Sequence, residues 1–120
     1  MSSMHGGLRP TVATVVLALD AEAMKGRPGF RSGVRPNHWI PGRDYALTGQ
    51  LDFLGREWLR PGEQCAALGT FIVPEQDRSS FVPGFTWNIG EGARIVGRCT
   101  LSQVLNEGEV LPDILEGNDA

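Results

Sequence analysis

The sequence predicts an all-β domain, an antiparallel barrel or sandwich, and three observations lead to that prediction. Short runs rich in β-branched and aromatic residues recur along the chain, and no stretch shows a long period of helical spacing. Sixteen glycines and eight prolines separate these runs, as tight turns would. The 120 residues suit one domain with a real core. Closure into a barrel would remove the sheet edges that invite aggregation.

Six segments are expected to be extended. The first, TVATVVLALD, is rich in β-branched side chains and follows Pro10, as the start of a strand often does. The third segment, residues 44–53, alternates roughly between apolar and polar side chains, which is typical of a strand with one buried face. The predicted strands are residues 11–20, 37–40, 44–53, 64–73, 85–89 and 93–105.

The connections between these segments are marked by turn residues. Residues 21–35 hold glycines and prolines among basic side chains and are predicted to be a loop. Residues 74–83 are predicted to be a polar loop. Tight turns are expected at 41–42, 60–63 and 90–92, where glycine permits the positive φ that such turns require.

The two ends of the chain differ from its middle in composition. Residues 1–9 are small, polar and glycine-bearing, and we expect a flexible N-terminus before a barrel domain at 10–105. Residues 106–120 form an acidic tail, for which a solvating role is the first expectation. The alternative is that its Leu-Pro-Asp-Ile-Leu run, residues 111–115, docks on a partner or folds against the barrel.

Charge is distributed unevenly along the chain, whose net charge is −3. Five acids and no base lie in residues 107–119; without them the 11 Lys and Arg residues outnumber the remaining acids. Such a basic stripe could attract phosphates, or it could be a solvated arginine-rich surface. Its members are Lys25, Arg27, Arg31, Arg35, Arg43, Arg56 and Arg60.

Cysteine and histidine usage gives no sign of a metal site. Cys65 and Cys99 lack CxxC spacing, and we expect two buried hydrophobic residues in a reducing compartment rather than a disulfide. His5 and His38 lie far apart, without a cysteine or carboxylate at ligand spacing. No apolar run approaches the roughly 20 residues of a membrane helix. We therefore expect a cytoplasmic protein that does not contact a membrane.

Catalytic motifs are also missing from the pattern. Gly90-Glu91-Gly92 and Gly97 superficially suggest a dinucleotide loop, but their spacing differs and a strand, not a helix, is predicted to follow. The only lysine, Lys25, is followed by Gly26, so a phosphate-cradling nucleotide loop is not expected. No GxSxG elbow is present. We expect no enzymatic activity, no cofactor and no nucleotide.

Four short motifs occur in a familiar order. They are Gly-Val-Arg-Pro-Asn at 33–37, Thr-Gly at 48–49, Pro-Gly at 61–62 and Gly-Glu-Gly-Ala-Arg-Ile-Val-Gly at 90–97. In order and approximate spacing the chain resembles the C-terminal, third β-barrel domain of elongation factor Tu over residues 10–105, here without the GTPase domain. The resemblance implies a six-stranded antiparallel β-barrel.

The resemblance also implies a binding surface. In that family the barrel helps to hold the T-stem of aminoacyl-tRNA and touches the exchange factor, elongation factor Ts. The positions that match the T-stem contacts are Asn37, Thr48, Glu91 and Gly92, and Arg27 and Arg35 are the neighbouring basic candidates. Asn37 replaces a glutamine of the family, and Gly90 replaces an arginine. For Arg35 and Arg94 we nevertheless expect a structural role, pairing with a carboxylate or with loop carbonyls, more often than a contact to RNA.

Two functions are consistent with this pattern. The first is a non-catalytic, translation-associated RNA-binding module with tRNA as its partner. The second is a protein-interaction module, or a decoy that mimics elongation factor Tu toward its protein partners. We expect a monomer. The large aromatic residues are expected in the core or at its ends rather than stacked on bases: Trp39, Trp58, Trp87, Phe53, Phe71 and Phe85.

Overall fold

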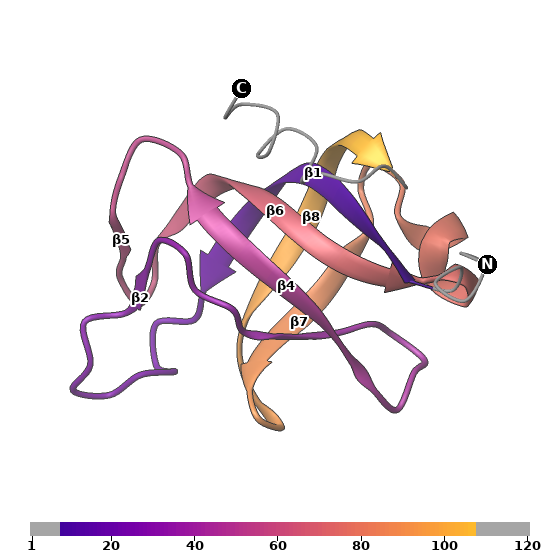
Figure 1. The fold of residues 1–120 in the computed structure, drawn as a ribbon. Helices are drawn as coiled ribbons and strands as arrows, with labels where there is room; N and C mark the ends of the chain where they lie inside the picture. The colour runs from indigo at the N-terminus through magenta and orange to yellow at the C-terminus, as the bar shows by residue number, and fades with distance from the viewer. Residues whose placement is uncertain (1–7, 108–120) are drawn as a thin grey trace.

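The computed structural model describes residues 8–107, in which six antiparallel strands close into a barrel (Figure 1). The strand order around the barrel is β1-β6-β4-β3-β7-β8. The fold class predicted from the sequence is confirmed, and the choice between barrel and sandwich is settled for the barrel. The strands are β1 (Leu8–Leu19), β3 (Asn37–Trp39), β4 (Ala46–Phe53), β6 (Gln64–Pro74), β7 (Thr86–Glu91) and β8 (Arg94–Glu107).

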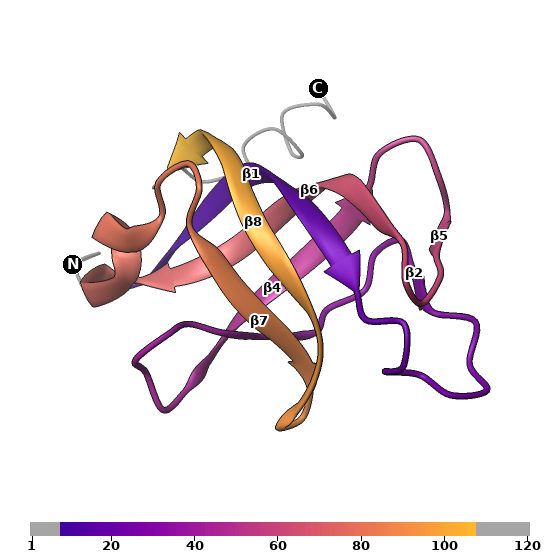
Figure 2. The ribbon, with the colours of Figure 1, turned by 180° about the vertical axis from the view of Figure 1, so that it is seen from behind.

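Strand structure extends slightly beyond the expected limits of the domain. β1 begins at Leu8 and β8 ends at Glu107, so both strands reach into segments assigned to the flexible N-terminus and the acidic tail. The rest of those segments lies outside the described residues. The turn between β7 and β8 occupies Gly92 and Ala93, which confirms the predicted hairpin and moves its tip by one residue (Figure 2).

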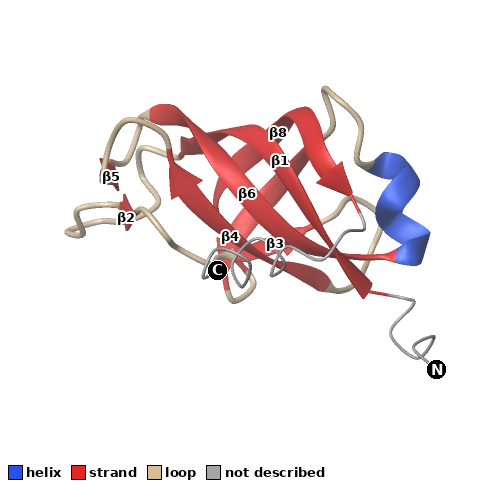
Figure 3. Cartoon of the chain, turned by 45° about the horizontal axis from the view of Figure 1, so that its top comes forward, coloured by secondary structure: helices blue, strands red, loops and turns tan. Residues whose placement is uncertain are grey.

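Two regions predicted to be loops contain short elements. β2 (Phe30–Arg31) pairs with β5 (Trp58–Leu59) in a small separate sheet, and η2 (Glu75–Ser80) is a 3-10 helix. Figure 3 shows this small sheet and η2 at opposite ends of the barrel. The loop predictions were wrong there because two-residue strands and a six-residue 3-10 helix are too short to show a hydrophobic period.

The core follows from the alternation of side chains along each strand. In β1 the odd-numbered positions from Thr11 to Leu19 are buried, while the even-numbered positions face outward and are partly buried. Cys65 and Cys99 both lie opposite Leu17, one on each side, which places them about 9–10 Å apart. A disulfide requires Cα atoms roughly 4.4–6.8 Å apart, so both remain free and buried, as expected. Burial raises the pKa of the Cys99 thiol to about 12.

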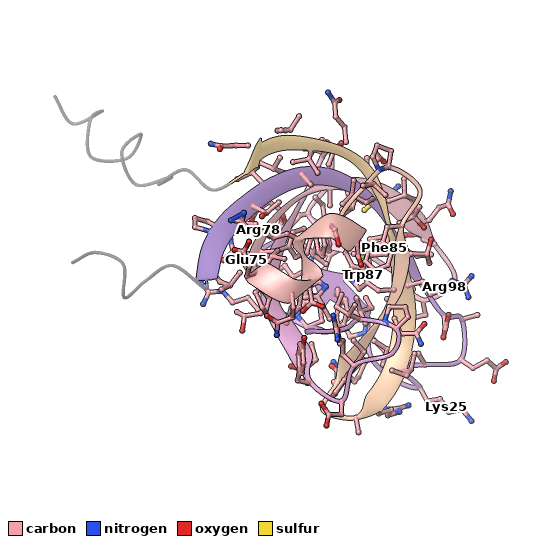
Figure 4. The ribbon with its side chains drawn as sticks, turned by 90° about the vertical axis from the view of Figure 1, so that its right-hand side faces the viewer. Lys25, Glu75, Arg78, Phe85, Trp87 and Arg98 are labelled. Atoms are coloured by element: carbon pink, nitrogen blue, oxygen red, sulfur yellow. The ribbon has the colours of Figure 1, made fainter. Side chains whose placement is uncertain are left out.

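An aromatic cluster fills the barrel at the end covered by η2, with Trp87 at its centre (Figure 4). The Trp87 ring stacks on Phe81 at a centroid distance of 5.3 Å and meets the edge of Phe71 at 5.6 Å. Phe53 is also buried, whereas Trp39 and Phe85 are partly exposed. Trp58 lies on the small β2–β5 sheet at one end of the barrel, where it is 40% exposed and the Arg31 guanidinium lies 5.9 Å from its ring centroid.

His38 is the buried polar member of this cluster, with 0% exposure. The indole Nε1 of Trp87 donates to His38 Nδ1 at 2.9 Å, so the proton resides on Nε2, which donates to the Gly49 carbonyl at 3.1 Å. Burial lowers the pKa of His38 to about 4, and the hydrogen bond to Gly49 opposes that shift. The ring is therefore neutral at pH 7 and links three strands.

A second buried group fastens η2 to the barrel. The Asp77 carboxylate, 1% exposed, accepts hydrogen bonds from Arg43 Nε at 2.8 Å and from the Tyr45 hydroxyl at 2.7 Å. The bond to Asp77 raises the pKa of Tyr45 because ionisation would place two negative charges together. Arg43, a member of the basic stripe, thus has a structural role.

Candidate binding surface

The six residues singled out in the sequence come together around two adjoining hollows on the outside of the barrel. The first hollow has a volume of about 250 Å³ and is lined by Arg35, Thr48, Gly49, Gln50 and Thr70. The second, of about 150 Å³, is lined by Phe30, Val34, Arg35, Pro36, Asn37, Gly90, Glu91 and Gly92. Arg35 lines both hollows. We call the two hollows together the Arg35 face.

The first hollow is built by outward-facing positions of two paired strands. Thr48 and Gln50 alternate along β4 with the buried Leu47, Gly49 and Leu51. The register places Gln50 opposite Thr70 of β6, so their side chains share the outer surface. The hollow therefore offers two hydroxyl groups and one amide on a rigid sheet.

Arg35 is positioned by the segment that precedes β3. Val34 forms a bridge with Leu51, through a hydrogen bond from Leu51 N to Val34 O at 2.9 Å. The Arg35 Nε then donates to Gln50 Oε1 at 2.9 Å, and the Gln50 amide donates onward to Asp52 at 3.1 Å. Within residues 8–107 the two terminal NH₂ groups of Arg35 have no hydrogen-bond or ion-pair partner. They remain available to an anion at the shared edge of the hollows.

The second hollow is closed by contacts to the β7–β8 hairpin. Asn37 Nδ2 and Trp39 Nε1 each donate to the Gly92 carbonyl at 3.1 Å. Gly92 has a φ of 62°, the left-handed conformation that glycine adopts without strain. Asn37 therefore holds the hairpin tip in place, in addition to lining the hollow.

Arg27 and Glu91 face each other across the rim of the second hollow. The two guanidinium NH₂ groups of Arg27 donate to the two carboxylate oxygens of Glu91 at 2.8 and 2.7 Å. This pair lowers the pKa of Glu91 and raises that of Arg27, in both cases mainly through the hydrogen bonds between them. The carboxylate is thus already occupied, and a ligand hydroxyl would have to compete with Arg27 for it.

The basic stripe divides into two groups in the structure. Four of its arginines form ion pairs: Arg27 with Glu91, Arg31 with Glu57, Arg43 with Asp77 and Arg56 with Glu63. Lys25, Arg35 and Arg60 have no ion pair within the described part of the chain. Of these three, Arg35 is the one that lines a hollow.

Sequence reasoning missed Gln50 and Thr70, which complete the first hollow. The alternation of buried and outward-facing positions along β4 and β6 could have indicated them, because Gln50 and Thr70 both occupy outward-facing positions. Only the register, however, brings them opposite one another.

The chemistry of the first hollow favours binding. Its lining provides a guanidinium, hydroxyls and an amide, but no cysteine, histidine or carboxylate that could act as nucleophile or base. No group of three or more His, Cys, Asp or Glu side chains that could hold a metal ion occurs within residues 8–107. The arrangement can bind an anion or a polar backbone by hydrogen bonds.

Comparison with known proteins did not identify a family for this chain. Neither a scan against models of protein families nor a search among curated proteins returned a match to this chain. Among the described residues, no helix has the length and apolar character needed to cross a membrane.

Proposed function

We propose that this protein is a non-catalytic binding module for structured RNA, with the backbone of a tRNA T-stem as the ligand that its resemblance to elongation factor Tu suggests. The main support for this proposal is the position of Arg35. Its terminal NH₂ groups have no partner among residues 8–107, and they lie between two hollows lined by hydroxyl and amide groups.

Each part of this surface suits a sugar–phosphate backbone. Arginine binds phosphate oxygens through two parallel hydrogen bonds, which fix orientation as well as charge. Threonine hydroxyls and the Gln50 amide can reach phosphate oxygens and ribose 2′-hydroxyls, the groups through which proteins recognise RNA helices by shape. The hollows are small and lie on the outer surface of the barrel, so the ligand would lie across them rather than enter.

The test is a titration of the full chain with aminoacyl-tRNA at two or more salt concentrations. If Arg35 contacts a phosphate, Arg35→Ala should weaken binding about tenfold, in line with roughly 1.5 kcal/mol or more for a charged hydrogen bond. The same variant should reduce the slope of log K against log salt by about 0.7–0.9, the effect of one lost phosphate contact.

Arg98→Ala is the matched control, because it removes the same charge. Arg98 projects from β8 (Figure 4), which is three strands from β4 in either direction around the barrel. Its loss should change the affinity less than about twofold, since distant surface charges are screened by salt. Undetectable or salt-independent binding would contradict the proposal, and so would equal losses for the two variants.

A second function has its own observation. Trp58 and Leu54 are 40% and 51% exposed near the small β2–β5 sheet, and Arg31 lies over the Trp58 ring. Tryptophan and arginine are the residues enriched in the centres of protein interfaces. A protein-interaction role at this sheet is therefore the alternative, including mimicry of elongation factor Tu toward its protein partners.

Calorimetric titration with purified elongation factor Ts tests this alternative. Trp58→Ala should weaken binding at least tenfold, while Arg60→Ala, an exposed change in the turn that follows β5, should have little effect. Absence of binding by the unaltered chain would rule out this partner, and equal effects of the two variants would rule out this surface.

A further inference from the structure

A chain of hydrogen bonds runs along the outer face of β4 beside the first hollow. Gln50 and Asp52 occupy outward-facing positions of β4, two residues apart. The Gln50 amide nitrogen donates to both Asp52 carboxylate oxygens, at 3.1 and 3.3 Å, and the Gln50 carbonyl oxygen accepts from Arg35 Nε at 2.9 Å. Among residues 8–107 the Asp52 carboxylate has no ion pair, so Gln50 does not compete with a cation for it.

The Asp52 carboxylate determines which way the Gln50 amide points. An ionised carboxylate accepts hydrogen bonds and cannot donate them, whereas the Nε–H of an arginine donates and cannot accept. If the amide were reversed, its oxygen would face the carboxylate of Asp52 and its NH₂ group would face the Nε–H of Arg35. Both contacts would be repulsive. Asp52 therefore fixes the orientation of Gln50, and Gln50 in turn fixes Arg35.

This orientation makes the first hollow rich in hydrogen-bond donors. Both bonds to Asp52 go to a single carboxylate, so they use one N–H of the Gln50 amide and leave the other N–H for a ligand. Because its Nε is engaged, Arg35 presents the edge formed by its two terminal NH₂ groups. The hydroxyl of Thr70, on the neighbouring strand β6, can rotate to donate as well (Figure 1).

A group that satisfies these donors must carry several acceptor oxygens close together. The terminal edge of an arginine binds two oxygens of one phosphate or one carboxylate through parallel hydrogen bonds. A carboxylate has only these two oxygens, whereas a tetrahedral phosphate has further oxygens for Gln50 and for a threonine hydroxyl. The donors come from three segments, namely the residues before β3, β4 itself and β6. The hollow therefore favours a phosphate over a carboxylate.

We propose that the first hollow is a binding site for a phosphate group and that Asp52 is its positioning residue. Arg35 holds two phosphate oxygens and the Gln50 N–H holds a third. Asp52 does not touch the ligand and keeps both donors aimed at it. The assignment of this phosphate to an RNA backbone rests on the proposed function, whereas the phosphate site itself does not.

The negative charge of Asp52 opposes phosphate binding only weakly. Residues two apart on one face of a strand are separated by about 6.7 Å. At that distance in water, two unit charges change an affinity by about threefold, and salt reduces the effect further. Loss of the correct donor orientation should cost more than this, so removing the Asp52 side chain should weaken the site even though it removes a negative charge.

The first experiment titrates the full chain with inorganic phosphate and, separately, with acetate at equal ionic strength. The side-chain signals of the Arg35 Nε–H and of the Gln50 NH₂ group are followed by NMR. We expect saturable shifts of these signals with phosphate and much smaller shifts with acetate, while the Nε–H signal of Arg98 stays unchanged in both. Equal responses to the two anions, equal responses at Arg35 and Arg98, or no response at all would overturn the proposal.

Three variants separate positioning from charge. Asp52→Ala removes both the charge and the acceptor oxygens, and it should weaken phosphate binding about threefold. Asp52→Asn removes the same charge but keeps an acceptor oxygen for Gln50, so binding should be unchanged or up to about threefold tighter. Asp44→Ala removes the charge of an exposed carboxylate in the connection between β3 and β4, and it should have little effect. If the two Asp52 variants bind phosphate equally well, the positioning role is rejected.

A titration with an RNA duplex of T-stem sequence then identifies the source of the phosphate. RNA that shifts the same Arg35 and Gln50 side-chain signals would place a backbone phosphate in the hollow. Binding of inorganic phosphate by a protein that does not bind RNA would support the site and reject only the proposed function. RNA binding that leaves both signals unmoved would overturn the phosphate site and leave the RNA function to another part of the surface.

Discussion

Two sets of polar side chains join segments of this barrel that are far apart in sequence, and they differ in their access to water. Inside, His38 is fully buried and joins Trp87 to the Gly49 carbonyl. Outside, Arg27 and Glu91 are joined by two hydrogen bonds, and 47% and 33% of their side-chain surfaces remain exposed. A buried polar group is costly to leave unpaired, whereas an exposed ion pair contributes little because water and salt screen it. The interior set therefore determines stability, and the exterior set can exchange partners.

The interior set reaches the first hollow at Gly49. Its carbonyl accepts from His38 inside the barrel, while its neighbours Thr48 and Gln50 face the first hollow. The interior network thus fixes the backbone that presents the binding groups. Changes inside should alter both stability and binding, while changes outside should alter binding alone.

The largest effect is expected from Phe71→Ala. Phe71 is fully buried and its ring meets His38 and Trp87 edge-on at 5.0 and 5.6 Å. Removing the ring leaves a cavity, so the free energy of unfolding in denaturant should fall by about 3–5 kcal/mol. The exposed neighbour Ile72→Ala should lower it by less than about 1 kcal/mol. Equal losses for the two variants would contradict the assignment of Phe71 to the core.

The next effect is the pH dependence due to His38. Its pKa is about 4 in the folded protein, mainly because of burial, against 6.5 in the unfolded chain. Below pH 6.5 His38 becomes protonated in the unfolded chain, whereas in the folded protein it stays neutral until about pH 4. The free energy of unfolding should therefore fall as the pH drops from 6.5 to 4, by about 3 kcal/mol in total, and His38 should contribute nothing above pH 7.

Unfolding in denaturant at half-unit pH steps measures this slope. His38→Gln should remove most of it, while His5→Gln, the other histidine variant, should leave it in place. Other carboxylates with lowered pKa values, such as Glu63 and Glu91, add a slope of the same sign at lower pH. A pH 4 to 6.5 slope that persists in His38→Gln would show that the histidine is not the cause.

Gly49→Ala should have an intermediate effect that reaches both the interior set and the first hollow. A Cβ at this position would clash with the Phe71 ring and would lie 2.9 Å from His38 Nε2. Overpacking of this kind typically destabilises by about 1–3 kcal/mol. The adjacent exposed change, Thr48→Ala, should cost far less stability. An unchanged midpoint of unfolding for Gly49→Ala would show that the interior is looser than described.

The smallest effect on stability is expected from Glu91→Gln. The substitution breaks an exposed ion pair, so the midpoint of thermal unfolding should barely move. It frees Arg27 at the rim of the second hollow, so RNA affinity should rise and the salt slope should steepen by up to about one phosphate contact. Glu57→Gln, which frees Arg31 on the small β2–β5 sheet, makes the same change in net charge. Equal gains for both variants would show that net charge alone is responsible.

The sequence patterns were sufficient for an antiparallel all-β fold, and the resemblance implied the barrel, but neither contained the pairing of side chains. Alternating apolar positions and turn residues located the six strands of the barrel, since these signals are local. The ion pair of Arg27 with Glu91 joins residues 64 positions apart, and the hydrogen bond of Trp87 to His38 joins residues 49 apart. Such contacts depend on register and barrel closure, which no local pattern contains.

The short strands were missed in the prediction for a different reason. β2 and β5 have two residues each, so they are defined by the partner across the sheet rather than by their own periodicity. The exposure of Trp58 follows from this position at the edge of a two-stranded sheet, where no second layer covers it.

The most direct test of the account is an NMR titration of the full chain with an RNA duplex of T-stem sequence. Because the account places the ligand across the Arg35 face, amide shifts should concentrate at Arg35, Thr48, Gln50 and Thr70, and should extend to Gly92. Residues around Arg98 on the opposite side should not respond. Saturating RNA that shifts no amide on the Arg35 face, or that shifts mainly the opposite side, would contradict the central claim.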